Sequence, residues 1–105
     1  MQEHPPAVSV VVAAYHSADF LPRCLDSLRR QTFRDFETIV VNSSQETRTA
    51  EVVSAYPEVR LFQNPQRLFP HAARNVGVAL TRGRLLAFTD ADCQAAPDWL
   101  AELVA

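Results

Sequence analysis

The chain has 105 residues and a formal net charge of −2, with 48% hydrophobic and 21% charged residues. This composition predicts one folded domain, excludes a disordered chain, and gives no electrostatic basis for binding nucleic acid or an anionic membrane. All ten basic residues are arginines, so Schiff-base chemistry and a P-loop lysine are excluded. The two glycines, Gly77 and Gly83, are too few for a G-x-G-x-x-G dinucleotide turn.

Apolar runs and helical periodicities follow one another along the chain. The valine-rich run at residues 8–14 predicts a strand that is buried on both faces, and Ser17 is placed to cap the next helix. Apolar residues three or four positions apart predict the helices, and polar or proline-containing segments separate the elements. The expected strands are 8–14, 36–41, 59–62 and 85–89, and the expected helices are 18–31, 48–56, 71–81 and one beginning at Pro97.

The alternation of strands and helices predicts an α/β fold with an open, mainly parallel sheet and helices on both faces. Three of the strands end in unusual polar segments, at residues 15–17, 42–44 and 90–92. Ligands of such sheets bind beyond the carboxyl ends of the strands. We therefore expect these three segments to meet at one edge of the sheet and to form a binding site.

Two carboxylates, Asp90 and Asp92, directly follow the last apolar strand. In extended backbone both side chains point to one side, where two ionised carboxylates repel each other unless a cation intervenes. Mg²⁺ and Mn²⁺ prefer oxygen ligands and are often shared with a diphosphate. The alternative interpretation is that Asp90 caps a turn and Asp92 is solvated, because a D-x-D pair is short and common by chance.

Two longer blocks of the sequence match the pattern of one known protein family. The family's opening block is matched by VSVVVAAYHSADFLPRCLDSLRRQTFRDFETIVVNSS, which has an apolar strand, a tyrosine turn, a helix and a second apolar strand. A later block is matched by AARNVGVALTRGRLLAFTDADCQAAPDWL, which contains A-R-N-x-G, a glycine turn and a strand that runs into D-A-D. In this order and spacing the motifs resemble family 2 glycosyltransferases of the GT-A fold, and the resemblance covers residues 7–104.

The resemblance implies a Rossmann-like fold that binds a nucleotide diphosphate sugar, a UDP- or GDP-sugar, with Mn²⁺ or Mg²⁺ as cofactor. The family transfers the sugar to an acceptor hydroxyl, usually with inversion. Carried over to this sequence, Asp92 is the more direct metal ligand, and Asp90 lies nearer the ribose or reaches the metal through water. Ala14 and Tyr15 match the turn that meets the base and ribose, and Arg74 matches an arginine of the nucleotide pocket.

The sequence also departs from the family pattern. Ala13 and His16 stand where proline and asparagine are common, and Asn42 stands where the family usually begins an Asp-Asp-Gly-Ser loop. The Asn42 carbonyl can still accept a hydrogen bond from the base, but without charge. The choice of nucleotide is therefore left open. Tyr15 can instead be a half-buried strand-end aromatic, and Arg74 a helix-surface arginine that pairs with a carboxylate.

Family members continue well past the D-x-D into an acceptor half, which carries the carboxylate general base. No such base is identifiable here. We therefore expect residues 1–105 to be a single truncated GT-A domain, the donor-nucleotide-binding half, which is inactive alone and self-associates through an exposed sheet edge. We expect a cytoplasmic protein without a transmembrane segment, located at the cytoplasmic face of the membrane if the full-length protein is longer.

Two other classes of protein compete with this interpretation. A non-catalytic Rossmann-like module for binding or assembly would explain the altered Asn42 loop, and metal-dependent nucleotide binding would separate it from the donor-binding interpretation. A haloacid dehalogenase-type phosphatase also uses D-x-D after a strand. That class is disfavoured because the motif follows the fourth strand, Gln94 replaces a threonine, and the required lysine is absent.

Overall fold

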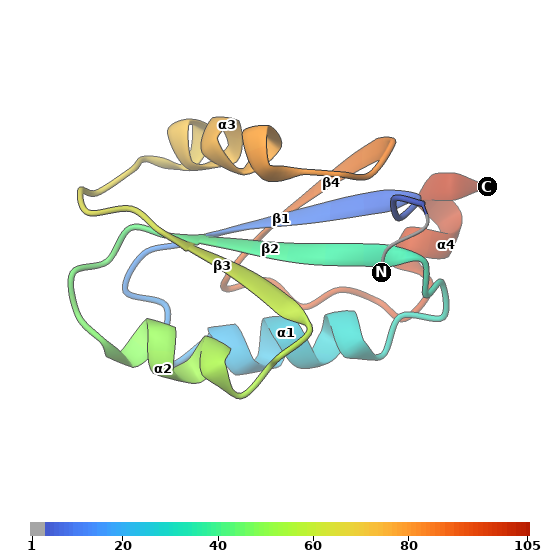
Figure 1. The fold of residues 1–105 in the computed structure, drawn as a ribbon. Helices are drawn as coiled ribbons and strands as arrows, with labels where there is room; N and C mark the ends of the chain where they lie inside the picture. Colours follow the sequence, from blue (N-terminus) through green and yellow to red (C-terminus); the bar gives the residue numbers. More distant parts are fainter. Residues whose placement is uncertain (1–3) are drawn as a thin grey trace.

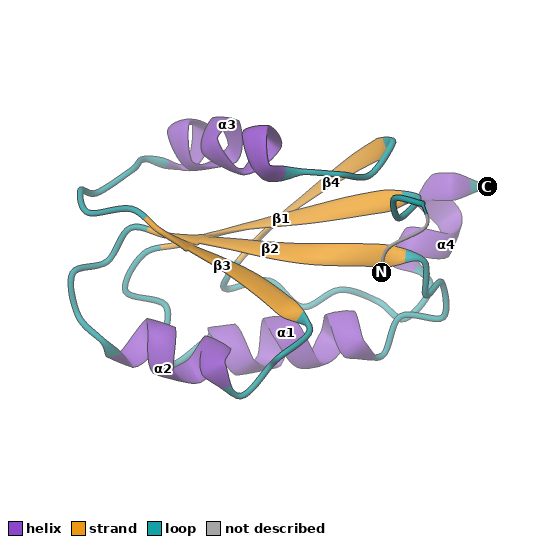
Figure 2. Cartoon of the chain, viewed as in Figure 1, coloured by secondary structure: helices purple, strands orange, loops and turns teal. Residues whose placement is uncertain are grey.

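The computed structural model describes residues 4–105. Strands and helices alternate along the chain, as Figure 2 shows by colour. The elements are β1 (Val8–Ala14), α1 (Leu21–Arg29), β2 (Phe36–Asn42), α2 (Arg48–Ser54), β3 (Val59–Gln63), α3 (Pro70–Leu80), β4 (Leu85–Asp90) and α4 (Trp99–Val104).

The four strands form one sheet in the order β3-β2-β1-β4, and every neighbouring pair is parallel. Ala14 pairs with Asn42 on one side of β1, and Ala13 pairs with Asp90 on the other side. Because of this register, the carboxyl ends of β1, β2 and β4 lie at one edge of the sheet (Figure 1). The predicted convergence of the polar strand ends is therefore confirmed.

Helices cover both faces of the sheet, as predicted. Helices α1 and α2 lie on one face and α3 lies on the other (Figure 1). Alternate residues of β1 serve the two layers: Val10 and Val12 belong to the same buried cluster as Leu25 of α1, whereas Val11 belongs to a cluster with Ala73 of α3. Helix α3 packs so closely that a Cβ atom at Gly77 would overlap the Val11 side chain.

Two helices begin two or more residues later than the sequence predicts. Helix α1 begins at Leu21, not at residue 18, because the Ser17 hydroxyl bonds to the backbone N–H and C=O of Tyr15 instead of capping the helix. Helix α4 begins at Trp99, not at Pro97. Pro97 lies in the loop before the helix, and its carbonyl accepts a hydrogen bond from Thr32 N. No helix within residues 4–105 is long and apolar enough to cross a bilayer.

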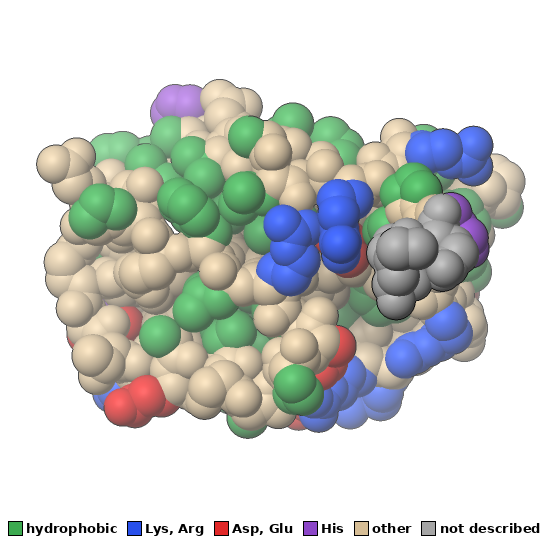
Figure 3. All heavy atoms as spheres, in the orientation of Figure 1, with side chains coloured by type: hydrophobic (Ala, Val, Ile, Leu, Met, Phe, Trp, Pro, Cys, Tyr) green, Lys and Arg blue, Asp and Glu red, His purple; other side chains and the backbone are tan. Residues whose placement is uncertain are grey.

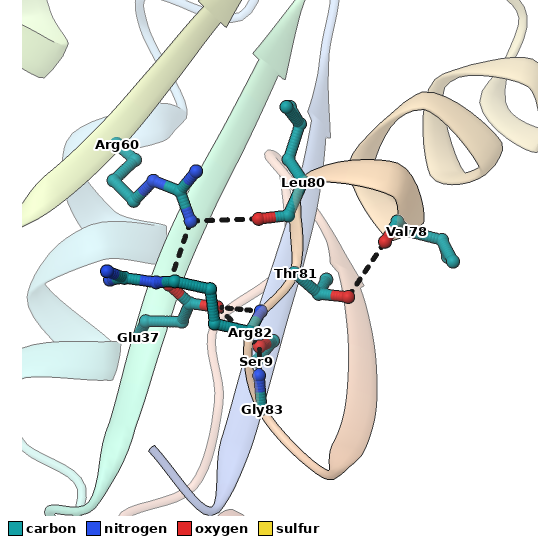
Figure 4. Close-up of polar contacts among 8 residues, drawn as sticks. All are labelled: Ser9, Glu37, Arg60, Val78, Leu80, Thr81, Arg82 and Gly83. Carbon is teal, nitrogen blue, oxygen red and sulfur yellow. Dashed lines mark hydrogen bonds and ion pairs between the residues drawn. The ribbon is translucent and has the colours of Figure 1, made fainter. Parts of the chain in front are cut away.

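A buried carboxylate fixes the connection between α3 and β4 (Figure 4). Glu37 Oε2 accepts hydrogen bonds from Ser9 Oγ at 2.6 Å and Arg82 N at 2.7 Å, and Oε1 accepts from Arg60 and Arg82 guanidinium groups at 3.0 Å. Ser9 Oγ in turn accepts from Gly83 N at 2.8 Å. Burial alone would raise the pKa of Glu37, but these donors outweigh it and hold the pKa below its ordinary value of 4.5.

Candidate functional site

A cavity of about 310 Å³ lies at the carboxyl edge of the sheet. Its walls come from the ends of β1 and β4, the turns after them, and the loop that leads into α3. Apolar side chains gather on the surface over α3 and that loop (Figure 3). Four of the residues predicted from the sequence line the cavity: Ala14, Tyr15, Asp90 and Asp92.

The turn after β1 holds Tyr15 in place. His16 has a φ of 50°, in the left-handed region, where asparagine, aspartate and histidine are the non-glycine residues most often found. This conformation gives a physical reason why histidine can replace the asparagine that is common in the family. His16 N donates to Ser44 Oγ at 2.9 Å, and the Tyr15 and His16 rings meet edge-on with centroids 4.5 Å apart.

The two aspartates reach the cavity from the end of β4. One ligand atom from each of Asp90, Asp92 and Cys93 lies within 4.8 Å of the others. The turn after the strand is made by backbone groups, because Cys93 N donates to the Asp90 carbonyl at 3.0 Å and Ala91 N donates to the Ala13 carbonyl at 3.2 Å. Neither carboxylate bonds to a backbone N–H of the described chain, so the turn-cap alternative for Asp90 has no support.

Arg74 extends from α3 toward the aspartates. Its Nη2 lies 3.5 Å from Asp90 Oδ1, and both side chains are about half exposed, at 40% and 47%. The structure therefore places Arg74 beside an aspartate of the cavity, although Arg74 does not line the cavity itself. Ion pairs this exposed contribute at most about 1 kcal/mol to stability, so Arg74 can exchange Asp90 for another anion at little cost.

Asn42 is a second predicted site residue that does not line the cavity. It is fully buried at the end of β2, where its Nδ2 donates to Gln63 Oε1 at 2.7 Å. Its Oδ1 accepts from Ser44 N at 3.2 Å and from Ser44 Oγ at 2.5 Å. Ser44 Oγ also accepts a hydrogen bond from His16 N. Asn42 therefore supports, through Ser44, the turn that carries Tyr15.

Among the cavity-wall residues that were not expected from the sequence, Arg67 and Phe69 make a specific contact. The Arg67 guanidinium lies 4.3 Å from the ring centroid of Tyr15 and 4.6 Å from that of Phe69, which are cation–π contacts. The sequence predicted only an irregular loop here. The one available sign was an arginine and a phenylalanine in a short loop that follows a strand end, where loop residues commonly meet ligands.

The segment after Asp92 is hydrogen-bonded to Ser27 of α1 and to Gln31, which follows that helix. Ala95 N donates to Ser27 Oγ at 3.0 Å, and the buried Gln31 side chain donates to the Ala96 carbonyl at 2.6 Å and accepts from Leu100 N at 3.0 Å. The acidic turn is thus held by the sheet on one side and by α1 on the other.

A parallel sheet with a cavity at its carboxyl edge and two carboxylates in that cavity is the arrangement of a Rossmann-like fold, in which ligands bind beyond the strand ends. Residues 9–105 match the family model described as "Glycosyl transferase family 2". The chain belongs to this family, as the resemblance implied.

The relatives and neighbouring structures are glycosyltransferases and a polysaccharide biosynthesis protein. The chain is 37% identical over 101 residues to the succinoglycan biosynthesis protein ExoO of Rhizobium meliloti, covering 94% of the chain and 29% of that protein. It matches the structure of S. aureus TarS 1–349 in complex with UDP-GlcNAc at a TM-score of 0.86 and 27% identity. This match covers 92% of the chain and 30% of the TarS chain. It also matches the mannosyltransferase PcManGT of Pyrobaculum calidifontis, in complex with GDP-Man and Mn²⁺, at a TM-score of 0.84 and 28% identity. This match covers 97% of the chain and 32% of the PcManGT chain.

These neighbours confirm the GT-A fold predicted from the sequence. The chain spans about 30% of the length of ExoO and of these two matched structures.

Proposed function

We propose that this chain is the donor-nucleotide-binding half of an inverting, metal-assisted glycosyltransferase that moves a sugar from a UDP- or GDP-sugar to an acceptor hydroxyl. The observation that carries the proposal is that Tyr15, Asp90 and Asp92 line one and the same cavity. An aromatic side chain can receive a nucleobase, and two carboxylates can hold the divalent ion that accompanies a diphosphate. The neighbours in complex with UDP-GlcNAc and with GDP-Man and Mn²⁺ support it.

The acidic residues fit a hard divalent ion. Carboxylate oxygens of Asp90 and Asp92 are the ligand type that Mn²⁺ and Mg²⁺ prefer, and they lie close enough to share one ion. As the resemblance implied, we assign Asp92 as the more direct metal ligand and place Asp90 nearer the ribose or in contact with the ion through water. Such an ion, when bound, supplies Lewis-acid neutralisation of the leaving diphosphate.

The remaining side chains have separate roles in this proposal. The turn at Ala14 and Tyr15 meets the base and ribose. Arg74 is placed to exchange its weak contact with Asp90 for a phosphate oxygen, since a guanidinium pairs with phosphate through two parallel hydrogen bonds. We assign Asn42 an indirect role, because its hydrogen bonds hold Ser44 and Gln63.

Transfer itself needs a general base that deprotonates the acceptor hydroxyl. Asp90 and Asp92 are the carboxylates that line the cavity within residues 4–105, and both are assigned to the metal. We therefore propose that the base comes from outside the described chain and that this half alone does not transfer sugar. We also propose a cytoplasmic location, which agrees with two free cysteines, Cys24 and Cys93.

The thermal midpoint of the chain tests donor binding directly. We expect UDP or GDP to raise the midpoint in the presence of Mn²⁺ and to have little effect in its absence. A ligand at 100 times its Kd adds about 2.7 kcal/mol of stability, which is roughly 10 °C for a domain of this size. If neither nucleotide moves the midpoint with Mn²⁺ present, the donor-binding proposal is wrong, and a non-catalytic binding or assembly module replaces it.

We further propose that the chain self-associates through β4, which is an edge strand of the sheet in residues 4–105. Leu86 and Phe88 are each 41% exposed and lie on the same face of β4, so they add apolar surface to unpaired backbone groups. We expect sedimentation velocity to show a mass that rises with concentration, and the double variant Leu86→Lys, Phe88→Lys to remain monomeric. Leu103→Lys, at an exposed leucine of α4, is the control and should still associate.

A further inference from the structure

Arg67 stands out among the residues of the cavity wall because it brings a positive charge that no acceptor in the described chain neutralises. No hydrogen bond or ion pair of its guanidinium occurs within residues 4–105; its contacts are the faces of Tyr15 and Phe69. Arg74, by contrast, already pairs with Asp90. An arginine has five N–H donors in a planar fork, so an arginine held only against aromatic rings keeps its full capacity to bind an anion.

The backbone on both sides of Arg67 is anchored. Gln45 Nε2 donates to the Pro65 carbonyl at 2.7 Å, and Leu68 N donates to Ser43 Oγ at 2.9 Å. The Arg67 side chain itself is exposed and has a long flexible stem. A change in the position of the guanidinium therefore requires only side-chain rotation, while the loop stays in place.

The position of the guanidinium conflicts with a bound base. Arg67 covers a face of the Tyr15 ring at 4.3 Å and so occupies the space that a planar nucleobase stacked on that face would fill, since paired aromatic rings have centroids about 4.5–7 Å apart. Tyr15, Arg67, Asp90 and Asp92 line the same cavity, so a group displaced from the ring remains beside the place proposed for the diphosphate. Cation–π contacts at exposed sites are weak, whereas a guanidinium–phosphate pair is charge-assisted and bidentate, so this exchange favours the bound state.

We propose that Arg67 covers the aromatic surface of Tyr15 and Phe69 in the free protein and turns to the diphosphate when a nucleobase takes its place on Tyr15. This inference rests on the proposed donor-binding function. It makes Arg67 a residue that discriminates nucleoside diphosphates from nucleosides, because only a ligand with phosphates compensates for displacing the guanidinium from the rings.

The test compares a nucleoside with its diphosphate on the same variants. Kd values for uridine and UDP, or for guanosine and GDP if GDP is the nucleotide that raises the midpoint, are measured with Mn²⁺ by NMR titration. For Arg67→Ala we expect weaker binding of the diphosphate, unchanged or tighter binding of the nucleoside, and a preference for diphosphate over nucleoside that falls about tenfold. Arg67→Lys keeps the positive charge without the planar fork, so its preference for diphosphate over nucleoside should lie between those of the wild type and Arg67→Ala.

Arg84→Ala is the matched control, because Arg84 is also exposed but lies beside Leu85 at the opposite end of β4. It should leave the preference unchanged. If the wild-type chain binds the diphosphate but Arg67→Ala leaves the preference unchanged, or weakens nucleoside and diphosphate equally, the role of Arg67 is wrong while the proposed function stands. If the wild-type chain binds neither ligand, both the proposed function and the role of Arg67 are overturned.

Discussion

Replacing Asp92 with alanine is expected to abolish the Mn²⁺-dependent rise in thermal midpoint that UDP or GDP produces, a loss of roughly 10 °C at saturating nucleotide. Asp92 is exposed, and its carboxylate bonds to no backbone group of the described chain, so the midpoint without ligand should stay close to that of the wild type. Scanning calorimetry with and without Mn²⁺ and nucleotide measures both quantities on the same protein.

Asp35→Ala is the control for the loss of one negative charge. Asp35 is also exposed, but it immediately precedes β2 and is thus at the opposite edge of the sheet from the cavity. This variant should keep the full Mn²⁺-dependent shift. A shift that survives in Asp92→Ala would remove Asp92 from the metal site, whatever the behaviour of Asp35→Ala.

Glu37→Ala is expected to lower the free energy of unfolding by about 3 kcal/mol. The substitution removes the acceptor of Ser9 Oγ and Arg82 N, and leaving a buried donor without a partner costs about 1–3 kcal/mol. Urea unfolding at pH 7 measures the difference. Glu58→Gln is the control, because Glu58 also pairs with an arginine, Arg29, but is about half exposed, so its loss should cost less than about 1 kcal/mol.

The contribution of Glu37 should also depend on pH in a definite direction. Its pKa in the folded protein lies below the ordinary value of 4.5, so its stabilising effect is fully present above that value and is lost as pH falls through the folded pKa. The stability difference between the wild type and Glu37→Gln should therefore be constant from pH 7 to about pH 5 and should narrow below pH 4.5. A difference that does not change with pH would mean that the charge of Glu37 contributes nothing.

The parts of the fold that depend on local pattern could be predicted from the sequence. The strand at residues 8–14 was placed correctly because a valine-rich run fits a strand buried on both faces. Asp90 and Asp92 were expected at a strand end because they follow the apolar run at residues 85–89. The start of α1 was wrong because a serine hydroxyl can bond to several nearby backbone groups, and sequence does not say which. The Ser17 hydroxyl bonds to the backbone of Tyr15 and does not cap the helix.

The parts that depend on register and loop path could not be predicted in this way. Asn42 faces Gln63 across β2 and β3, and that pairing exists only once the two strands are aligned. The family pattern suggests that this residue contacts the base, and the strand register gives its side chain hydrogen-bond partners inside the protein. The contact of Arg67 with the ring of Tyr15 could not be predicted for a similar reason. No local pattern specifies that the loop after β3 brings an arginine onto that ring.

The fastening of residues 95–100 to Ser27 and Gln31 affects the entropy of ligand binding. A loop that is free before binding loses backbone freedom worth roughly 1–2 kcal/mol per residue when a ligand orders it. Here the wall that carries Asp90 and Asp92 is already ordered when the chain folds, so an arriving ion meets carboxylates in position. The remaining ordering cost falls on side chains of the opposite wall, and amide exchange near the aspartates should change little when nucleotide binds.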